Sequence, residues 1–440
     1  MRMLQAPACG LVLAMAAGVH CAEQLRNLIY FDQYHTTSLP SRNVTSGITH
    51  VVMAFANSSL FIGETAGEYT PFMEVSDVRA MFDDGTQVGI ALGGWGDTAG
   101  FSEGAKDEES RKTFAQNVAA MAESQGFDFV DIDWEYPGGN GADYRQIPNA
   151  NKTDEITTFP LLLQEIKTAI QRPLSIAAPG LEGDMIAYTP EQSSKIWDAV
   201  DFVNIMTYDL MNRRNNATKH HTDVQGSLAA VEKYLSLGLG SSKINLGFAF
   251  YAKYFQTEPG VNCTGMPVGC PIVKAENDDG SDAGTSGAVT FETANVAPVV
   301  PTNLTASTDG SCGAGTFYTC AGSTAGTCCS PYGYCGSTGA HCGAGCQSDY
   351  GTCTGPSITD SFAKALESGW TDEVAGGQWY WDDEAELFWT LDTVALIQRK
   401  FEDIVAAKGL GGAFAWSLGE DSYDWSHLTT VSEGVKNLEQ

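Results

Sequence analysis

The chain has 440 residues, of which 43% are hydrophobic and 18% charged, so it can form one large globular domain and a smaller one. It carries 54 Asp and Glu against 24 Lys and Arg, which gives a formal net charge of −30. A surface this acidic repels phosphate backbones and anionic lipid headgroups, so we expect neither nucleic acid nor a membrane as a partner.

The first residues have the composition of a secretory signal peptide. Arg2 precedes an apolar run from Ala8 to Val19, which is too short to span a bilayer, and small residues follow it. We interpret residues 1–22 as a removable signal peptide; the alternative is a buried N-terminal helix. No later stretch has the length of a membrane span, and residues 435–440 lack the hydrophobic tail of a lipid anchor. We therefore expect a secreted, extracellular protein.

The cysteines support export. Ten of the 12 are Cys263, Cys270 and eight residues within 312–353. An even number of clustered cysteines in an exported chain indicates disulfide bonds rather than metal ligands. N-glycosylation sequons compatible with secretion begin at Asn43, Asn57, Asn151, Asn216, Asn262 and Asn303.

Eight apolar runs alternate with segments that suit helices, such as 110–125 and 154–171. The runs are 27–32, 49–56, 87–94, 127–135, 173–179, 201–208, 244–251 and 411–418. Nearly continuous apolar strands separated by helices are typical of a parallel sheet covered on both faces. Eight such units predict an α/β fold of the TIM-type (β/α)8 barrel class, with a doubly wound open sheet as the alternative.

The seventh and eighth runs begin at residues 244 and 411, much further apart than the others. We predict that the first part of the barrel (23–296) is followed by a Pro/Thr/Ser linker (297–311) and a cysteine-rich module (312–353). The second part of the barrel (354–440) resumes with a helical stretch and the aromatic run 376–383. A barrel tolerates such an insertion because lengthening a surface loop costs little entropy.

The fourth run carries an unusual row of acids. Asp131, Asp133 and Glu135 alternate with apolar residues, so their side chains project to one side of the strand. Three carboxylates this close cannot all be charged near a barrel interior, so we expect them to titrate together with at least one protonated. The alternatives are a divalent cation bound by the three oxygen ligands and a solvated edge strand.

Glu135 stands last in this row, directly before the turn 136–139. Active sites of (β/α)8 barrels lie at the carboxyl ends of the strands. The position therefore favours Glu135 as a catalytic acid.

The run DFVDIDWEYP (128–137) resembles the D-x-x-D-x-D-x-E signature of glycoside hydrolase family 18, the chitinases and their relatives. Leu92-Gly93-Gly94-Trp95 is similar to the family's S-x-G-G element, with Ala91 where Ser is usual, and 206–209 (MTYD) matches its M-x-Y-D element. The likeness is greatest to fungal class V chitinases. Phe129 departs from the usual Gly, but it is not one of the carboxylates, so we expect the mechanism to be unaffected.

The resemblance implies substrate-assisted retaining hydrolysis. Glu135 would protonate the glycosidic oxygen and later activate water, while the sugar's own acetamide attacks C1. Asp133 would hold the acetamide N–H, and Asp131 would share a proton with Asp133. Tyr208 would bind the acetamide oxygen, and Asp209 would help fix the sugar and tune Glu135.

The same resemblance suggests which residues bind sugar rings. Trp416 on the eighth run falls where the family has a tryptophan at the cleft floor, and Trp95 is a second stacking candidate, because pyranose rings pack on indole. Tyr30, Gln378 and Tyr380 are further candidates for lining the cleft. Met206 is a candidate for either contact or packing.

Residues 312–353 hold eight cysteines and few apolar residues, which is typical of a module stabilised by disulfides. A zinc site is the alternative, but paired C-x-x-C elements are missing. The segment resembles the hevein-like chitin-binding module (carbohydrate-binding module family 18), and that implies Cys312–Cys329, Cys320–Cys335, Cys328–Cys342 and Cys346–Cys353. Ser330, Tyr332 and Tyr334 match its sugar-binding positions, and His341 stands where an aromatic residue is usual. We expect Cys263 and Cys270 to pair.

Together these features predict a secreted chitinase that binds chitin and N-acetylglucosamine oligomers as a monomer, with no cofactor and no metal. Three alternatives stay open. They are a non-hydrolytic chitin-binding lectin, an endo-N-acetylglucosaminidase acting on N-glycans, and a toxin-like protein that docks on a cell wall.

Overall fold

The computed structural model describes residues 24–439 apart from residues 66, 299–301, 314 and 344. The predicted signal peptide, 1–22, therefore lies outside the described residues. Within the described ranges, no helix has both the length and the apolar composition needed to cross a membrane.

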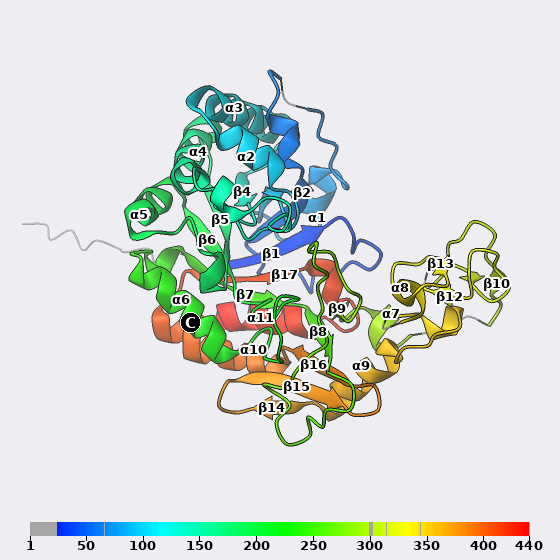
Figure 1. Ribbon diagram of the computed structural model, residues 1–440. Coiled ribbons are helices and arrows are strands. Elements are labelled where there is room, and N and C mark those ends of the chain that lie inside the picture. Colours follow the sequence, from blue (N-terminus) through cyan, green and yellow to red (C-terminus); the bar gives the residue numbers. More distant parts are fainter. Residues whose placement is uncertain (1–23, 66, 299–301, 314, 344, 440) are drawn as a thin grey trace, which may run out of the picture.

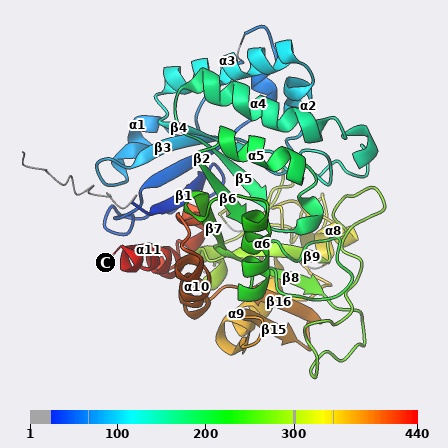
Figure 2. The same ribbon diagram turned by 90° about the vertical axis from the view of Figure 1, so that its left-hand side faces the viewer.

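A closed barrel of parallel strands forms the centre of the molecule (Figures 1 and 2). The strands neighbour one another in the order β1-β17-β7-β6-β5-β4-β3-β2. They are β1 Arg26–Asp32, β2 His50–Ala56, β3 Gln87–Gly93, β4 Phe129–Asp133, β5 Leu174–Pro179, β6 Phe202–Met206, β7 Ile244–Ala249 and β17 Gly412–Trp416. These are the eight predicted runs, so the predicted barrel is confirmed and the open-sheet alternative is wrong.

Helices pack around the outside of the barrel. They are α1 Val75–Ala80, α2 Ala99–Ala105, α3 Glu108–Gln125, α4 Glu155–Ile170, α5 Pro190–Ala199, α6 Val224–Ser236, α10 Val394–Lys400 and α11 Ser426–Leu438. The pair α3 and α4 lies on the opposite side of the barrel from α10 and α11 (Figure 2). The capping residues define α3: the Asp107 side chain accepts a hydrogen bond from the Ser110 N–H, and Gly126 ends the helix with a φ of 77°.

The apolar residues of β4 and its row of acids face opposite ways. Val130, Ile132 and Trp134 belong to the large core between barrel and helices. Phe129 points to the barrel interior on the same face as the acids and packs against Phe202, with ring centroids 5.9 Å apart. Gly89 on β3 leaves the necessary space, because a Cβ there would lie 2.4 Å from the Phe129 ring.

A second sheet, which was not predicted, lies between β7 and β17 in the sequence. Its strands are ordered β14-β15-β16-β8-β9. They are β14 Trp370–Asp372, β15 Gly377–Asp382, β16 Leu387–Leu391, β8 Tyr251–Gln256 and β9 Ser286–Thr290. The predicted helix after the cysteine-rich module is α9 Ile358–Ser368, and the aromatic run 376–383 contains β15. The excursion out of the barrel therefore contains two units rather than one.

The cysteine-rich module projects from the side of the molecule (Figure 1). Its described residues form short elements: β11 Tyr318–Thr319, β12 Cys328–Cys329, β13 Cys335–Gly336, α8 Gly339–Cys342 and the 3-10 helix η5 Ser348–Tyr350. The segment expected to be linker follows α7 Thr293–Val296 and differs from that expectation, because β10 Thr305–Ala306 pairs with β11. The module rests against the second sheet where Gly345 approaches the Tyr254 hydroxyl.

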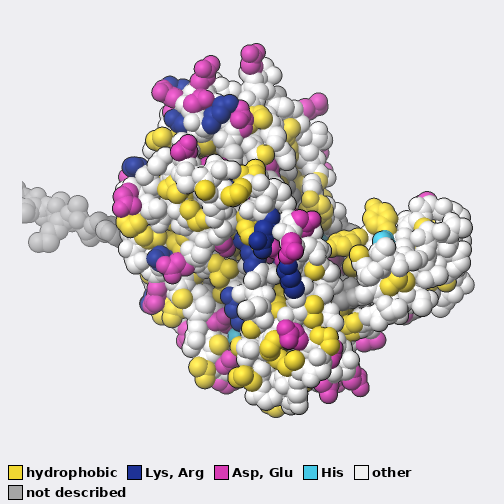
Figure 3. All heavy atoms as spheres, in the orientation of Figure 1, with side chains coloured by type: hydrophobic (Ala, Val, Ile, Leu, Met, Phe, Trp, Pro, Cys, Tyr) yellow, Lys and Arg dark blue, Asp and Glu magenta, His cyan; other side chains and the backbone are white. Residues whose placement is uncertain are grey.

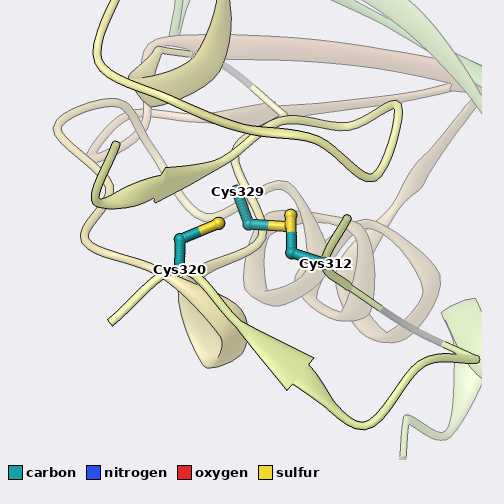
Figure 4. Close-up of side chains that lie close together, drawn as sticks. All are labelled: Cys312, Cys320 and Cys329. Carbon is teal, nitrogen blue, oxygen red and sulfur yellow. A yellow bond between two sulfur atoms is a disulfide. The ribbon is translucent and has the colours of Figure 1, made fainter. Parts of the chain in front are cut away.

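Disulfides take the place of a large core in this module. The structure joins Cys312 to Cys329, Cys320 to Cys335, Cys328 to Cys342 and Cys346 to Cys353, the pairs that the resemblance implied, and it also joins Cys263 to Cys270. Three sulfur atoms, those of Cys312, Cys320 and Cys329, come close enough to ligate one ion (Figure 4). Each of them is bonded to another sulfur, so they offer no thiolate to zinc.

A buried ion pair connects the barrel to the end of the second sheet. Lys400 at the end of α10 donates to both carboxylate oxygens of Asp392 at 2.6 and 2.9 Å and to the Thr222 hydroxyl at 2.5 Å. The Lys400 and Asp392 side chains have no exposed surface.

We predict that Lys400→Met lowers the free energy of unfolding by about 3–5 kcal/mol, because it leaves the Asp392 charge buried without its partner. Urea unfolding followed by circular dichroism measures the change. Lys112→Met removes an exposed partner of Glu108 on α3 and should leave the free energy of unfolding nearly unchanged, because water screens that pair. Equal losses in the two variants would contradict the assigned importance of burial.

Candidate active site

A cleft of about 960 Å³ opens at the carboxyl ends of the barrel strands. Of the residues predicted from the sequence, its lining contains Glu135, Asp133, Tyr208, Asp209, Trp416, Trp95, Met206 and Tyr30. They come from loops and strands far apart in the chain, and the barrel brings them together. Asp131 lies beneath the lining, fully buried.

Two glycines let β3 approach the acids closely. The Gly94 N–H donates to the Asp133 carbonyl at 2.9 Å, and a Cβ on Gly93 would lie 2.2 Å from that same oxygen. Gly93 also has a φ of +106°, which side chains rarely allow. The G-G element therefore sets the path of the backbone that carries Asp133.

Asp131 is fixed by three donors. The Tyr30 hydroxyl donates to its Oδ2 at 2.7 Å, and the Ser175 hydroxyl and the Asn204 amide donate to its Oδ1 at 2.6 and 3.3 Å. Burial raises the pKa of Asp131 to about 6, and these hydrogen bonds oppose the rise. Because its recorded bonds among the described residues go to other groups, the predicted proton sharing with Asp133 is not present as a direct contact.

Asp133 and Glu135 lie in a site that disfavours negative charge. Burial and then the charges of Glu135 and Asp131 raise the pKa of Asp133 well above its usual range, and its Oδ1 is buried without a partner. Burial raises the pKa of Glu135 to about 7; a hydrogen bond with Tyr136 opposes the rise, and the charges of Asp209 and Asp184 add to it. Both groups can therefore hold a proton near neutral pH.

Asp209 has the opposite character. The Tyr251 hydroxyl donates to it at 2.8 Å, and the Lys253 ammonium lies 3.0 Å away. Burial opposes its ionisation, but Lys253 and His221 hold the pKa of Asp209 well below its usual range. The site thus holds an ionised aspartate close to a protonated glutamic acid.

An aromatic platform forms the cleft floor. The Trp416 ring stacks on Phe55 with centroids 5.4 Å apart and lies 5.7 Å from the Tyr30 ring. Burial and then the neighbouring acids raise the pKa of Tyr208 well above its usual range, so its hydroxyl stays a hydrogen-bond donor.

A cluster of charged groups beneath the floor fixes Trp416. The Trp416 indole N–H donates to Glu420 at 3.1 Å, and the His35 Nδ1 lies 2.9 Å from Asp32 and 3.6 Å from Glu420. The side chains of Asp32, His35 and Glu420 are close enough together to bind a metal ion. Burial opposes the charging of His35, but its hydrogen bond to Asp32 and the Glu420 charge raise its pKa to about 9. The imidazolium supplies the positive charge here.

The other end of the cleft has a different chemistry. Trp95 is 52% exposed and lies beside Tyr136, with ring centroids 6.4 Å apart. Arg213, Arg214 and Lys253 also line the cleft, although the chain is strongly acidic. On the surface, Lys and Arg side chains gather near the middle of one face beside acidic ones (Figure 3).

The prediction that Gln378 and Tyr380 line the cleft is wrong. Both lie on β15 of the second sheet, away from the cleft lining. Gln378 is buried and accepts a hydrogen bond from the Thr371 hydroxyl at 2.8 Å, and Tyr380 packs on the apolar cluster under α9. The aromatic side chains of this run stabilise the second sheet, because they alternate between its two faces and pack on each of them.

The module presents two of its predicted sugar-binding residues to solvent. Tyr332 and Tyr334 are 73% and 62% exposed. Ser330 is buried, and its hydroxyl accepts a hydrogen bond from the Tyr334 N–H at 3.1 Å, so it holds the turn that carries the tyrosines. His341 is hydrogen-bonded to Thr338 at 2.7 Å.

Several cleft residues were not predicted, among them Asp184, Arg214, Tyr251 and Lys253. Tyr251 and Lys253 lie on β8, which begins two residues after the end of β7, at the barrel end where sites form. Two adjacent arginines, Arg213 and Arg214, are unusual in a chain this acidic, and they could have been predicted from the sequence as functional residues.

Comparison with known proteins places this geometry in a family. Residues 26–421 match the model of glycosyl hydrolases family 18. Chitinase 1 of Aphanocladium album is 26% identical over 53% of this chain and 62% of its own, and chitotriosidase-1 of Mus musculus is 26% identical over 59% and 61%. The chain thus spans about three fifths of the length of these curated relatives.

Solved structures share the fold. The catalytic domain 2 of the Group II chitinase of Ostrinia furnacalis has a TM-score of 0.64 at 18% identity, covering 94% of this chain and 97% of that one. A Cycas revoluta family 18 chitinase solved with (GlcNAc)4 has a TM-score of 0.62 at 18% identity, covering 93% and 99%. The barrel, the acids on β4 and the family match agree: the chain belongs to glycosyl hydrolases family 18.

Proposed function

We propose that this chain is a secreted chitinase that hydrolyses β-1,4 bonds between N-acetylglucosamine units with retention of configuration. The observation that carries the proposal is the position of Glu135 in the lining of a cleft beside Asp133, Tyr208 and Trp416. Burial there raises the pKa of its carboxyl group to about 7. A general acid works best when its pKa is near the working pH.

The first step uses Glu135 as an acid. A sugar ring packs on Trp416, and the Glu135 carboxyl donates its proton to the glycosidic oxygen as the C1–O bond breaks. The carbonyl oxygen of the sugar's 2-acetamido group bonds to C1 and gives a cyclic oxazolinium ion. The leaving sugar departs with the proton as its hydroxyl.

Asp133 and Tyr208 act on the acetamide. The Tyr208 hydroxyl donates to the acetamide oxygen and aims it at C1, and Asp133 accepts from the acetamide N–H and stabilises its growing positive charge. Asp209, held ionised by Lys253, keeps Glu135 protonated until the bond breaks. Water then attacks C1, the bond between C1 and the acetamide oxygen breaks so that the acetamide is restored, and the Glu135 carboxylate takes a proton from the water.

The module supports a polymer as substrate. The exposed tyrosines Tyr332 and Tyr334 offer stacking surfaces outside the cleft, which suits an insoluble chain of sugars. We propose chitin as the substrate for this reason, and secretion follows from the predicted signal peptide and the five disulfides.

Glu135→Gln should lower kcat for chitohexaose by at least about a thousandfold, because the amide cannot donate the proton. Chromatography of the products measures turnover, and calorimetry should show that the oligomer still binds. Turnover near the wild-type value would refute the assignment. Binding without turnover by the wild-type protein would instead favour the lectin alternative.

The pH profile tests the charges around Glu135. Because the protonated form is the active acid, kcat/KM should fall as pH rises through about 7. Asp209→Asn removes a charge that raises the pKa of Glu135, so this basic limb should move to lower pH. Asp184→Asn should move it in the same direction by less. A limb that stays in place or moves to higher pH would contradict this electrostatic account.

The Tyr332→Ala/Tyr334→Ala double variant should weaken adsorption to insoluble chitin by about tenfold or more, since each lost stacking surface removes roughly 1 kcal/mol. A pull-down with chitin powder measures adsorption. Hydrolysis of soluble chitohexaose should change by less than about twofold. Equal losses on both substrates would show that the module supports the barrel instead of binding chitin.

A further inference from the structure

Arg214 contacts residues from four other loops around the cleft. It lies in the loop after β6, and its guanidinium sits 4.1 Å from the centroid of the Tyr144 ring and 5.8 Å from that of the Trp95 ring. It also donates to the Gly141 carbonyl at 3.2 Å. Trp95 follows β3, and Gly141 and Tyr144 follow β4, so one side chain connects three rim segments.

Two acids complete this set. Arg214 lies 3.9 Å from Asp184, in the loop after β5, and 3.9 Å from Glu276, in the loop between β8 and β9. The Tyr144 hydroxyl also donates to Glu276. We call Arg214 with Trp95, Tyr144, Asp184 and Glu276 the Arg214 clamp, and all five residues line the cleft.

The clamp joins loops from nearly opposite sides of the barrel mouth. In the barrel, β4 and β7 are separated by β5 and β6, and β8 follows β7 directly. The β4 and β8 loops are connected a second time by Gln146, whose amide donates to the Asp279 carbonyl at 2.7 Å. This part of the cleft is therefore bounded by a network of loop residues, whereas Trp416 belongs to the cleft floor.

Trp95 depends on this network for its orientation. Its ring is 52% exposed, and its recorded aromatic and cation contacts among the described residues are those with Tyr136 and Arg214. A planar guanidinium can hold two aromatic rings while its N–H groups face carboxylates, which an ammonium cannot do in the same way.

We propose that Arg214 is a positioning residue that determines how sugar rings bind at the Trp95 end of the cleft. This rests on the proposed function. Arg214 holds Trp95 as a stacking platform and fixes the loops beside it, so an oligosaccharide of N-acetylglucosamine binds there with a defined register. Arg213 offers a control, because it is the adjacent residue and lies 3.4 Å from Asp282 without a recorded ring contact in the described residues.

A double-mutant cycle tests the proposal by binding alone. In a Glu135→Gln background, calorimetry with chitohexaose gives Kd for Trp95→Ala, Arg214→Gln and the combination. Each single change should raise Kd about tenfold. Because Arg214 acts through Trp95, the combination should raise it by no more than about thirtyfold. A rise of about a hundredfold, the product of the two effects, would overturn the proposal.

Two variants separate the stacking contact from charge. Arg214→Lys keeps the charge and should weaken binding as Arg214→Gln does; wild-type affinity in this milder variant would overturn the role of the planar group. Arg213→Gln combined with Trp95→Ala should give effects that multiply. If Arg213→Gln and Trp95→Ala are coupled as strongly as Arg214→Gln and Trp95→Ala, the proposal would also be overturned.

Hydrolysis gives a readout that a loss of folding would not produce. With Glu135 present, Arg214→Gln should raise KM for chitohexaose about tenfold, leave kcat within about threefold and redistribute the bonds cleaved. A fall in kcat alone with unchanged products would count against the clamp. If the Glu135→Gln protein binds no chitohexaose, the proposed function is wrong. If it binds chitohexaose but the effects of Trp95→Ala and Arg214→Gln on Kd multiply, only the proposal for Arg214 is wrong.

Discussion

The site depends on a row of three carboxyl groups, two of them buried on β4 and the third, Glu135, just past the end of that strand. Every second residue from Asp131 places an acid on the same face, and the barrel interior removes the water that would screen their charges. The environments of Asp131 and Asp133 differ. Asp131 receives three donors, whereas the Asp133 Oδ1 receives none, so the charged form of Asp131 is the better stabilised of the two. Glu135, nearest the mouth, is left as an acid that can give up its proton.

The surroundings of the row follow from this constraint. Gly93 and Gly94 let a neighbouring backbone reach the Asp133 carbonyl, and Gly89 makes room for Phe129 below the acids. Asp209 is kept ionised by Lys253, and its charge helps to keep Glu135 protonated. The cleft floor is held from beneath by the His35 imidazolium and Glu420. Charge placement, more than the overall charge of the chain, thus defines the site.

Much of the barrel could be predicted, because its strands are continuous apolar runs whose period differs from that of the helices between them. The acid row was equally visible, since Asp131, Asp133 and Glu135 occupy positions where a strand would normally carry Val or Ile. The second sheet was not visible. Its strands are short and polar at the edges, and the aromatics of β15 alternate between two covered faces, which led to the wrong assignment of Gln378 and Tyr380 to the cleft. The partners of Arg214 are spread over residues 95–276 and become neighbours only in the folded chain.

The central claim is that the sugar's own acetamide oxygen, oriented by Asp133 and Tyr208, attacks C1 while Glu135 protonates the glycosidic oxygen that leaves C1. Proton NMR of the first products from chitohexaose tests it most directly, because the anomeric form of the new reducing end records the side from which water attacked. The account predicts the β-anomer as the initial product, which then mutarotates. An initial α-anomer would mean direct attack by water and would contradict it.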